Sequence, residues 1–171
     1  MSQPARPTGR TLEEFKDQDT ESGLKPAENA LLACAHQGDP CILDKNEKPP
    51  VRASFIRFLA LGGDDEAPVH EKGIWLFNAT IEEQLDLNQC KGVLPLNLND
   101  CSFSSHQPII LQDAHISLLS LQGSAVPGGI NGDRATVRGN VFLRNGADIE
   151  GDVRFSGAHV HGDLDANWSS L

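Results

Sequence analysis

The spacing of apolar residues changes near residue 73, and the change divides the chain into two structural classes. Before it, apolar positions recur at helical spacing. Segment 26–37 begins with Pro26 and is followed by Gly38, which predicts a short amphipathic helix. A second stripe runs from Val51 to Leu59 and predicts another helix, ended by Gly62-Gly63. Residues 1–24 are polar, and we expect a disordered tail with at most one short helix.

From residue 73 onward, one pattern repeats about every eleven residues: apolar, any, apolar, two corner residues, small, any, apolar. Allowing one inserted residue, 32 of the 36 marked positions are apolar, whereas about 14 are expected from a 39% hydrophobic content. The repeat is therefore a property of the chain and not of its composition. The nine units begin at residues 74, 85, 96, 109, 119, 130, 141, 153 and 164.

Such a repeat is typical of a β-solenoid. The alternating apolar pair places two side chains on one face of a short strand, and the small residue fits where the chain turns back into a narrow interior. One unit cannot enclose a core, so we expect two units, about 22 residues, to form each coil. Gly128, Gly139, Gly151 and Gly162 each precede a strand, where we expect corners of positive φ. The predicted fold is mainly β, a right-handed β-helix over 73–171 with an α-helical N-terminal cap over 25–72.

Two stretches carry a resemblance to known families. The lead-in IRFLALGGDDEAPVHEKGIWLFNATIEEQLDL and the repeat RATVRGNVFLRNGADIEGDVRFSGAHVHGDLDA resemble bacterial pentapeptide-repeat-like proteins, often labelled membrane-associated oxidoreductases. The resemblance covers residues 26–171 and implies a right-handed β-helix behind a helical cap. The period here is eleven and not five, so the kinship is one of architecture. The G-D-V and G-D-L runs are also similar to bactofilins, which are cytoskeletal β-helices, over residues 130–166.

Charge and composition narrow the function. The 171 residues carry 14 basic and 24 acidic side chains, a net charge of −10, which disfavours binding to nucleic acid or to anionic lipid. No apolar run is long enough to span a bilayer. The polar N-terminus has no secretory signal, so we expect a cytoplasmic protein with reduced cysteines.

Candidate chemistry is sparse. Cys34, His36 and Cys41 match no common zinc spacing, and His159 and His161 are expected to point outward from one strand as surface residues. The acidic residues of 148–165 lack the nonapeptide calcium signature. We therefore predict no metal, no cofactor and no catalytic residues. Four arginines within 21 positions form a candidate patch for an acidic protein partner: Arg134, Arg138, Arg144 and Arg154.

These observations favour a non-enzymatic binding or scaffold solenoid that acts through a protein partner or through self-association at an open C-terminal solenoid end. The alternative is an acidic DNA-mimicking inhibitor of a nucleic-acid enzyme, since residues 73–171 carry 11 acidic and 5 basic side chains. An oxidoreductase is the third hypothesis. It has the least support, because the chain contains no G-x-G-x-x-G, no C-x-x-C and no P-loop.

Overall fold

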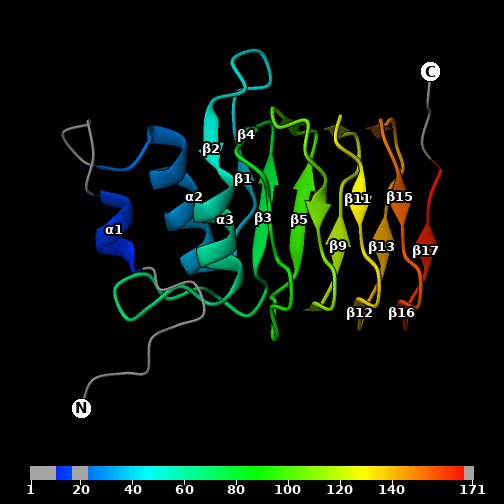
Figure 1. Ribbon diagram of the computed structural model, residues 1–171. Coiled ribbons are helices and arrows are strands. Elements are labelled where there is room, and N and C mark those ends of the chain that lie inside the picture. The colour runs from blue at the N-terminus through cyan, green and yellow to red at the C-terminus, as the bar shows by residue number, and fades with distance from the viewer. Residues whose placement is uncertain (1–10, 17–22, 168–171) are drawn as a thin grey trace.

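The computed structural model describes residues 11–16 and 23–167 as helices at one end of a stack of short parallel strands (Figure 1). The chain winds around four faces, which we name sheets A, B, C and D in the order in which each coil visits them. Sheets A and B hold the following strands: in A, β1 (Cys41–Ile42), β3 (Ile74–Phe77), β5 (Leu96–Asn99), β9 (Leu119–Ser120), β13 (Val141–Phe142) and β17 (Leu164–Asp165); in B, β2 (Pro50–Arg52), β4 (Thr80–Glu82), β6 (Ser102–Phe103), β10 (Ala125–Val126) and β14 (Asp148–Ile149).

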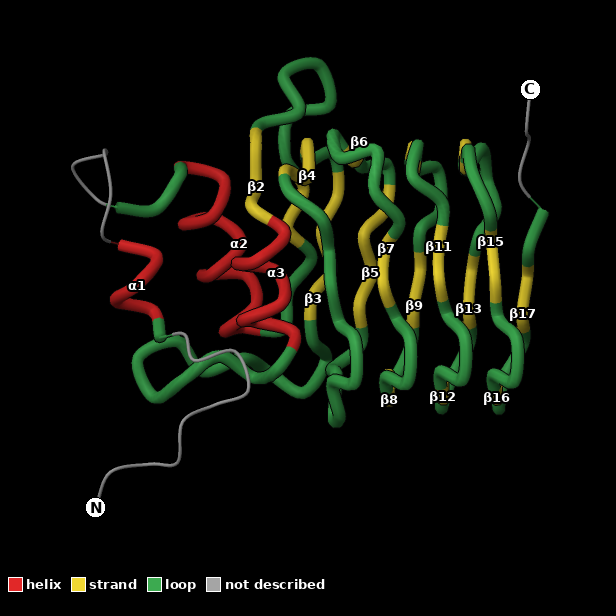
Figure 2. The backbone as a smooth tube through the Cα atoms, viewed as in Figure 1, coloured by secondary structure: helices red, strands yellow, loops and turns green. Residues whose placement is uncertain are grey.

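Sheets C and D close the other two sides of the solenoid. Their strands are as follows: in C, β7 (Ile109–Ile110), β11 (Ile130–Asn131) and β15 (Val153–Arg154); in D, β8 (His115–Ile116), β12 (Thr136–Val137) and β16 (His159–Val160). All strand pairs in these sheets are parallel. Figure 2 shows how short the strands are compared with the connecting corners.

The registers confirm the predicted coil of two units. Ile74 pairs with Leu96, Leu96 with Leu119, and Val141 with both Leu119 and Leu164, so each coil advances the chain by about 22 residues. The first unit of a coil covers sheets A and B, and the second covers sheets C and D. The marked apolar positions form a buried aliphatic core that runs along the stack as far as Ile149, and those of the last two units are partly buried or exposed among the described residues.

Each unit turns at a corner with a left-handed backbone conformation. In each of the first eight units, a residue at the corner before the small position has positive φ, between 52° and 71°, and in the unit that begins at residue 141 the inserted Gly146 also has positive φ, 87°. Asn and Asp tolerate this left-handed conformation better than other non-glycine residues, and Gly adopts it freely. The residues are Asn78, Gln89, Asp100, Asp113, Gly123, Arg134, Asn145 and Gly157.

The glycines before the strands have a different role from the one expected. Among the four, Gly151 has positive φ, whereas Gly128, Gly139 and Gly162 do not. A Cβ on Gly128 would lie 2.1 Å from the Gln107 carbonyl oxygen of the preceding coil. The expectation of positive φ is wrong at three of these four positions, where glycine is needed because adjacent coils approach too closely for a side chain.

The cap consists of α2 (Pro26–Gln37) and α3 (Ala53–Ala60), which pack against the first strands of sheets A and B. It is not purely helical, because β1 and β2 also lie within 25–72 and begin these two sheets. The expected start of the second helix is wrong for the same reason, since Val51 lies in β2 and the helix begins at Ala53.

Part of the expected tail belongs to the core. Helix α1 (Leu12–Lys16) buries Leu12 and Phe15, and the Phe15 ring centroid lies 5.3 Å from the centroids of both Phe55 and Phe58. Residues 1–10 and 17–22 of the predicted tail lie outside the described residues. Leu12 and Phe15 therefore dock this five-residue helix onto the core, although residues 1–24 contain too few apolar side chains to form a core of their own.

A buried ion pair joins the cap to the first coil. Glu28 is fully buried, and its carboxylate accepts hydrogen bonds from the backbone N–H groups of Lys25, at 3.1 Å, and Arg52, at 2.9 Å. The Arg52 guanidinium adds bonds of 2.9 Å from Nε and 2.7 Å from Nη2. The carboxylate thus satisfies the start of α2 and fixes the strand that precedes α3.

Candidate functional site: the outer face of sheet A

The outer face of sheet A carries aromatic side chains where the repeat allows any residue. Successive coils place Trp75, Asn97, Ser120 and Phe142 in one column, because these residues are paired through β3, β5, β9 and β13. A neighbouring column contains Ile42, Phe77 and Asn99. Outward positions of a soluble solenoid are usually polar, so three aromatic rings on one face mark a candidate interaction surface.

These columns border an open hollow of about 340 Å³, which we call the sheet A hollow. A volume of this size accommodates a single side chain or a small ligand. The eight residues that line the hollow are Trp75, Phe77, Asn97, Asn99, Asp100, Gln122, Phe142 and Asn145.

The floor of the hollow is a network of amides and a hydroxyl. The Ser120 hydroxyl donates to Asn99 Oδ1 at 2.7 Å and accepts from Gln122 Nε2 at 3.2 Å. The Gln122 backbone N–H donates to Asn99 Oδ1 at 3.1 Å. Ser120 and Asn99 are buried although they face outward. The floor is therefore rigid and is fixed before any partner binds.

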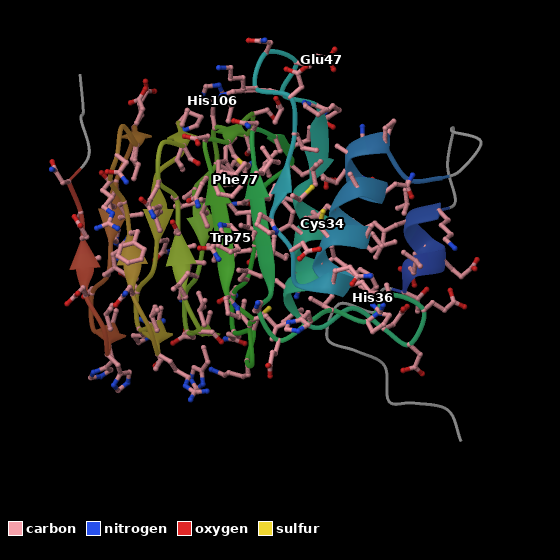
Figure 3. The ribbon with its side chains drawn as sticks, turned by 180° about the vertical axis from the view of Figure 1, so that it is seen from behind. Cys34, His36, Glu47, Trp75, Phe77 and His106 are labelled. Atoms are coloured by element: carbon pink, nitrogen blue, oxygen red, sulfur yellow. The ribbon has the colours of Figure 1, made fainter. Side chains whose placement is uncertain are left out.

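One end of the hollow is apolar and exposed. Trp75 retains 42% of its accessible surface, and its ring centroid lies 6.3 Å from that of Phe77, with the two planes tilted by 37°. Ile42, 71% exposed, pairs with Phe77 in the register of β1 and β3 and extends the apolar area toward the cap. Figure 3 shows Trp75 and Phe77 next to each other over the strands, away from His36 in the cap.

The opposite end of the hollow already holds an arginine. The Arg144 guanidinium carbon lies 4.2 Å from the centroid of the Phe142 ring. Its Nη1 donates to Asp165 Oδ2 at 2.7 Å, and its Nε donates to Gln122 Oε1 at 3.3 Å. A ring, a carboxylate and an amide oxygen thus surround one guanidinium.

The structure separates the four arginines of the predicted patch. Arg134 lies at the corner between sheets C and D, Arg154 lies on sheet C, Arg144 follows sheet A, and Arg138 follows sheet D. They therefore leave the solenoid from several sides. Three of them form ion pairs with aspartates on a neighbouring coil, with 2.8 Å between Arg134 Nε and Asp113 Oδ1.

These ion pairs hold adjacent coils together. The two-pronged hydrogen bond from Arg134, followed by its positive charge, keeps the pKa of Asp113 below its ordinary value. Arg154 binds Asp133, one coil apart, through a single hydrogen bond from its Nη2, and the other Asp133 oxygen accepts from the Ser156 backbone N–H. Arg138 is exposed and has no ion pair among the described residues. Binding of an acidic partner by this set stays a prediction.

The remaining candidate groups lie away from sheet A. His159 and His161 are both exposed, as expected. His36 lies in the cap, where its Nδ1 is 3.2 Å from the Pro68 carbonyl oxygen, beside a second hollow of about 260 Å³. Within residues 11–16 and 23–167, no group of three or more His, Cys, Asp or Glu side chains has an arrangement that could hold a metal ion.

The four cysteines are free thiols, and three of them are buried. Burial raises the pKa of Cys41 and of Cys101 to about 12. For Cys41, the neighbouring Cys34 raises the pKa further. At neutral pH these thiols are protonated, poor nucleophiles and fillers of the core.

Comparisons with known proteins add no assignment: no protein-family model, no curated protein and no solved structure matches the chain. None of the described helices has the length and apolar character needed to cross a bilayer. The candidate site therefore depends on its geometry alone.

The sequence pattern contained a signal for this site. Trp75 and Phe142 occupy the "any" position between two inward apolar residues in units 74 and 141, and Phe77 directly follows an inward position. Residues of this type are expected to face solvent once the strand pattern is accepted. The distance between units 74 and 141 in the chain conceals that both belong to one face.

Proposed function

We propose that this protein is a non-enzymatic binding solenoid that recognises a protein partner through the outer face of sheet A. The observation that carries the proposal is the sheet A hollow, with Trp75 exposed at its rim over a rigid polar floor. Aromatic residues beside buried hydrogen-bonding groups are the composition that binding hot spots favour.

The chemistry of the hollow supports binding more than catalysis. Asp100 is the one acidic side chain among its eight lining residues, and the others are aromatic rings and amides. No lining residue is a serine, cysteine, histidine or lysine, and the one carboxylate, that of Asp100, has no second acidic or basic side chain beside it in the lining. These residues can contact a bound partner and fix its orientation.

The DNA-mimic hypothesis draws less support from the geometry. Asp113, Asp133 and Asp165 form ion pairs with arginines of neighbouring coils, which reduces the negative charge that the solenoid presents. A phosphate-like stripe requires unpaired carboxylates at regular spacing along one face.

Site-specific photo-cross-linking tests the proposal. We expect Ile42→p-benzoylphenylalanine, an exposed position of sheet A beside the hollow, to form a discrete adduct with a protein in extracts of the native cell. The matched control is Thr136→p-benzoylphenylalanine, an outward position on sheet D. The adduct at position 42 should disappear when Trp75→Ala is added. Equal adducts at both positions, or an adduct that persists without Trp75, would show that sheet A is not the binding face.

A further inference from the structure

The sheet A face contains an arginine held by groups of the chain itself and a second set of ring, amide and carboxylate side chains beside it. The Arg144 guanidinium stacks on Phe142 and is held by Asp165 and Gln122. This arrangement shows which chemistry the face can recognise, namely a planar cation bounded by a ring, a carboxylate and an amide oxygen.

The second set lines the same hollow, from Trp75 on β3 to Asp100 at the corner after β5. Asp100 is exposed, and no hydrogen bond or ion pair links its carboxylate to another described residue. Asn97 donates from Nδ2 to the Ile74 carbonyl oxygen at 3.3 Å, and its Oδ1 accepts no hydrogen bond from the described residues. Trp75 is the aromatic side chain that attracts cations most strongly.

The strand register brings these groups together. Trp75 pairs with Asn97 and Phe77 pairs with Asn99 across β3 and β5, and Asp100 follows Asn99 at the corner. Neighbouring strands lie about 4.8 Å apart, so the rings, the amide oxygen and the carboxylate come from adjacent coils. One oxygen of the Asp100 carboxylate lies 2.1 Å from where a Cβ on Gly123 would be, so the carboxylate points toward the coil that follows β5 and lies near the middle of the hollow.

We infer that the sheet A hollow, between Trp75 and Asp100, binds the guanidinium of an arginine side chain on the protein partner. The inference rests on the proposed function and specifies its chemistry. The net charge of −10 attracts a basic segment, and the unpaired Asp100 supplies the local counter-charge. Arginine fits better than lysine, because its planar fork can stack on an indole while it donates to a carboxylate and an amide.

Short peptides provide a direct test. The probes are acetyl-Gly-Gly-Arg-Gly-Gly-amide and its lysine and citrulline counterparts, titrated into the folded chain while the Trp75 indole N–H signal is followed by NMR. Trp168→Phe assigns that signal. We expect the arginine peptide to bind at least about 10-fold more tightly than the citrulline peptide, which has nearly the same shape and no charge. The lysine peptide should be weaker than the arginine peptide.

Matched charge removals locate the site. Asp100→Asn should weaken the arginine peptide at least about 5-fold, because it removes the counter-charge while asparagine still tolerates the positive φ of this corner. Asp148→Asn removes the same charge from sheet B and should leave the affinity unchanged. Equal binding of arginine and citrulline peptides, or equal effects of the two substitutions, would overturn the inference.

The outcome separates this inference from the proposed function. If Asp100→Asn leaves both the peptide affinity and the adduct at position 42 unchanged, the arginine site is wrong and the binding face stands. If no adduct forms at position 42, the proposed function fails as well. A second copy is the other available donor, since Arg138 is exposed; a dimer abolished by both Asp100→Asn and Arg138→Ala would overturn the assignment to a different protein.

Discussion

The stacked core makes a quantitative prediction, because one column of sheet A contains the same residue in two environments. Leu96 is fully buried and pairs with Ile74 on one side and Leu119 on the other. Leu164 occupies the same register position in β17, where it is 50% exposed and, among the described residues, pairs with Val141 alone. We expect Leu96→Ala and Leu164→Ala to differ in stability although their chemistry is identical.

The magnitude follows from burial and from the rigidity of the stack. Truncating a buried leucine to alanine costs about 2–5 kcal/mol, and the cost is greatest where neighbours cannot move into the cavity. Backbone hydrogen bonds hold the coils on both sides of Leu96, so we expect about 3–5 kcal/mol. Leu164 is half exposed and has one stacked neighbour, so we expect about 1 kcal/mol or less.

Urea denaturation at low protein concentration measures both values. The difference corresponds to a Tm that is about 10 °C lower for Leu96→Ala than for Leu164→Ala. Equal losses of stability, or a loss below about 1 kcal/mol for Leu96→Ala, would refute the reasoning, since the coil interior would then relax around a missing side chain.

Three further predictions concern the cap, the thiols and the far end of the solenoid. Glu28→Gln should cost about 3 kcal/mol in denaturant titrations, because it leaves Arg52 without its buried counter-charge, whereas Glu82→Gln on the surface should cost less than about 1 kcal/mol. Burial raises the pKa of Cys101 from 9.0 to about 12, so the folded state keeps this thiol neutral while the unfolded chain ionises it. Stability should therefore fall as the pH rises from 9 toward 12, and Cys101→Ala should show a smaller loss; an equal loss would contradict the assignment. Self-association at the end that carries Leu164 predicts a dimer at tens of micromolar by light scattering and a monomer for Leu164→Lys, and a wild-type monomer would count against it.

The solenoid could be predicted from sequence because its repeat is a local property. Each inward apolar pair, corner and small residue lies within eight positions of the chain, and this pattern occurs nine times. The two-unit coil followed from the size of a closed core. The pattern does not show why a given position requires glycine. Gly128 is required because adjacent coils approach closely, whereas Gly151 adopts a positive φ.

The cap was less predictable because its order depends on distant partners. Val51 fits a helical stripe, yet it pairs with Ile81 and becomes the first buried position of β2. Phe15 stands in a polar segment and becomes buried through the rings of Phe55 and Phe58. Neither outcome has a local signal, because each depends on a surface that forms only when the first coil closes.

The candidate site was missed for a related reason. The sequence suggests charged residues such as Arg134 and Arg154 as a patch for a partner, yet both form ion pairs with aspartates of a neighbouring coil. Trp75 and Phe142 lie 67 positions apart in the chain, and only the stacking of β3 to β13 places them on the same hollow. Side-chain columns of this kind require the coil length to be known before they can be assigned.

Oxidative footprinting of the protein with its partner, once cross-linking has identified that partner, tests the central claim most directly. Hydroxyl radicals modify exposed aromatic and imidazole groups, and the solenoid carries such groups on two different faces. The account predicts that the partner protects Trp75 and Phe77 on sheet A and leaves His115 and His159 on sheet D as reactive as in the free protein. Protection of the two histidines with unchanged oxidation of Trp75 would contradict the assignment of sheet A as the binding face.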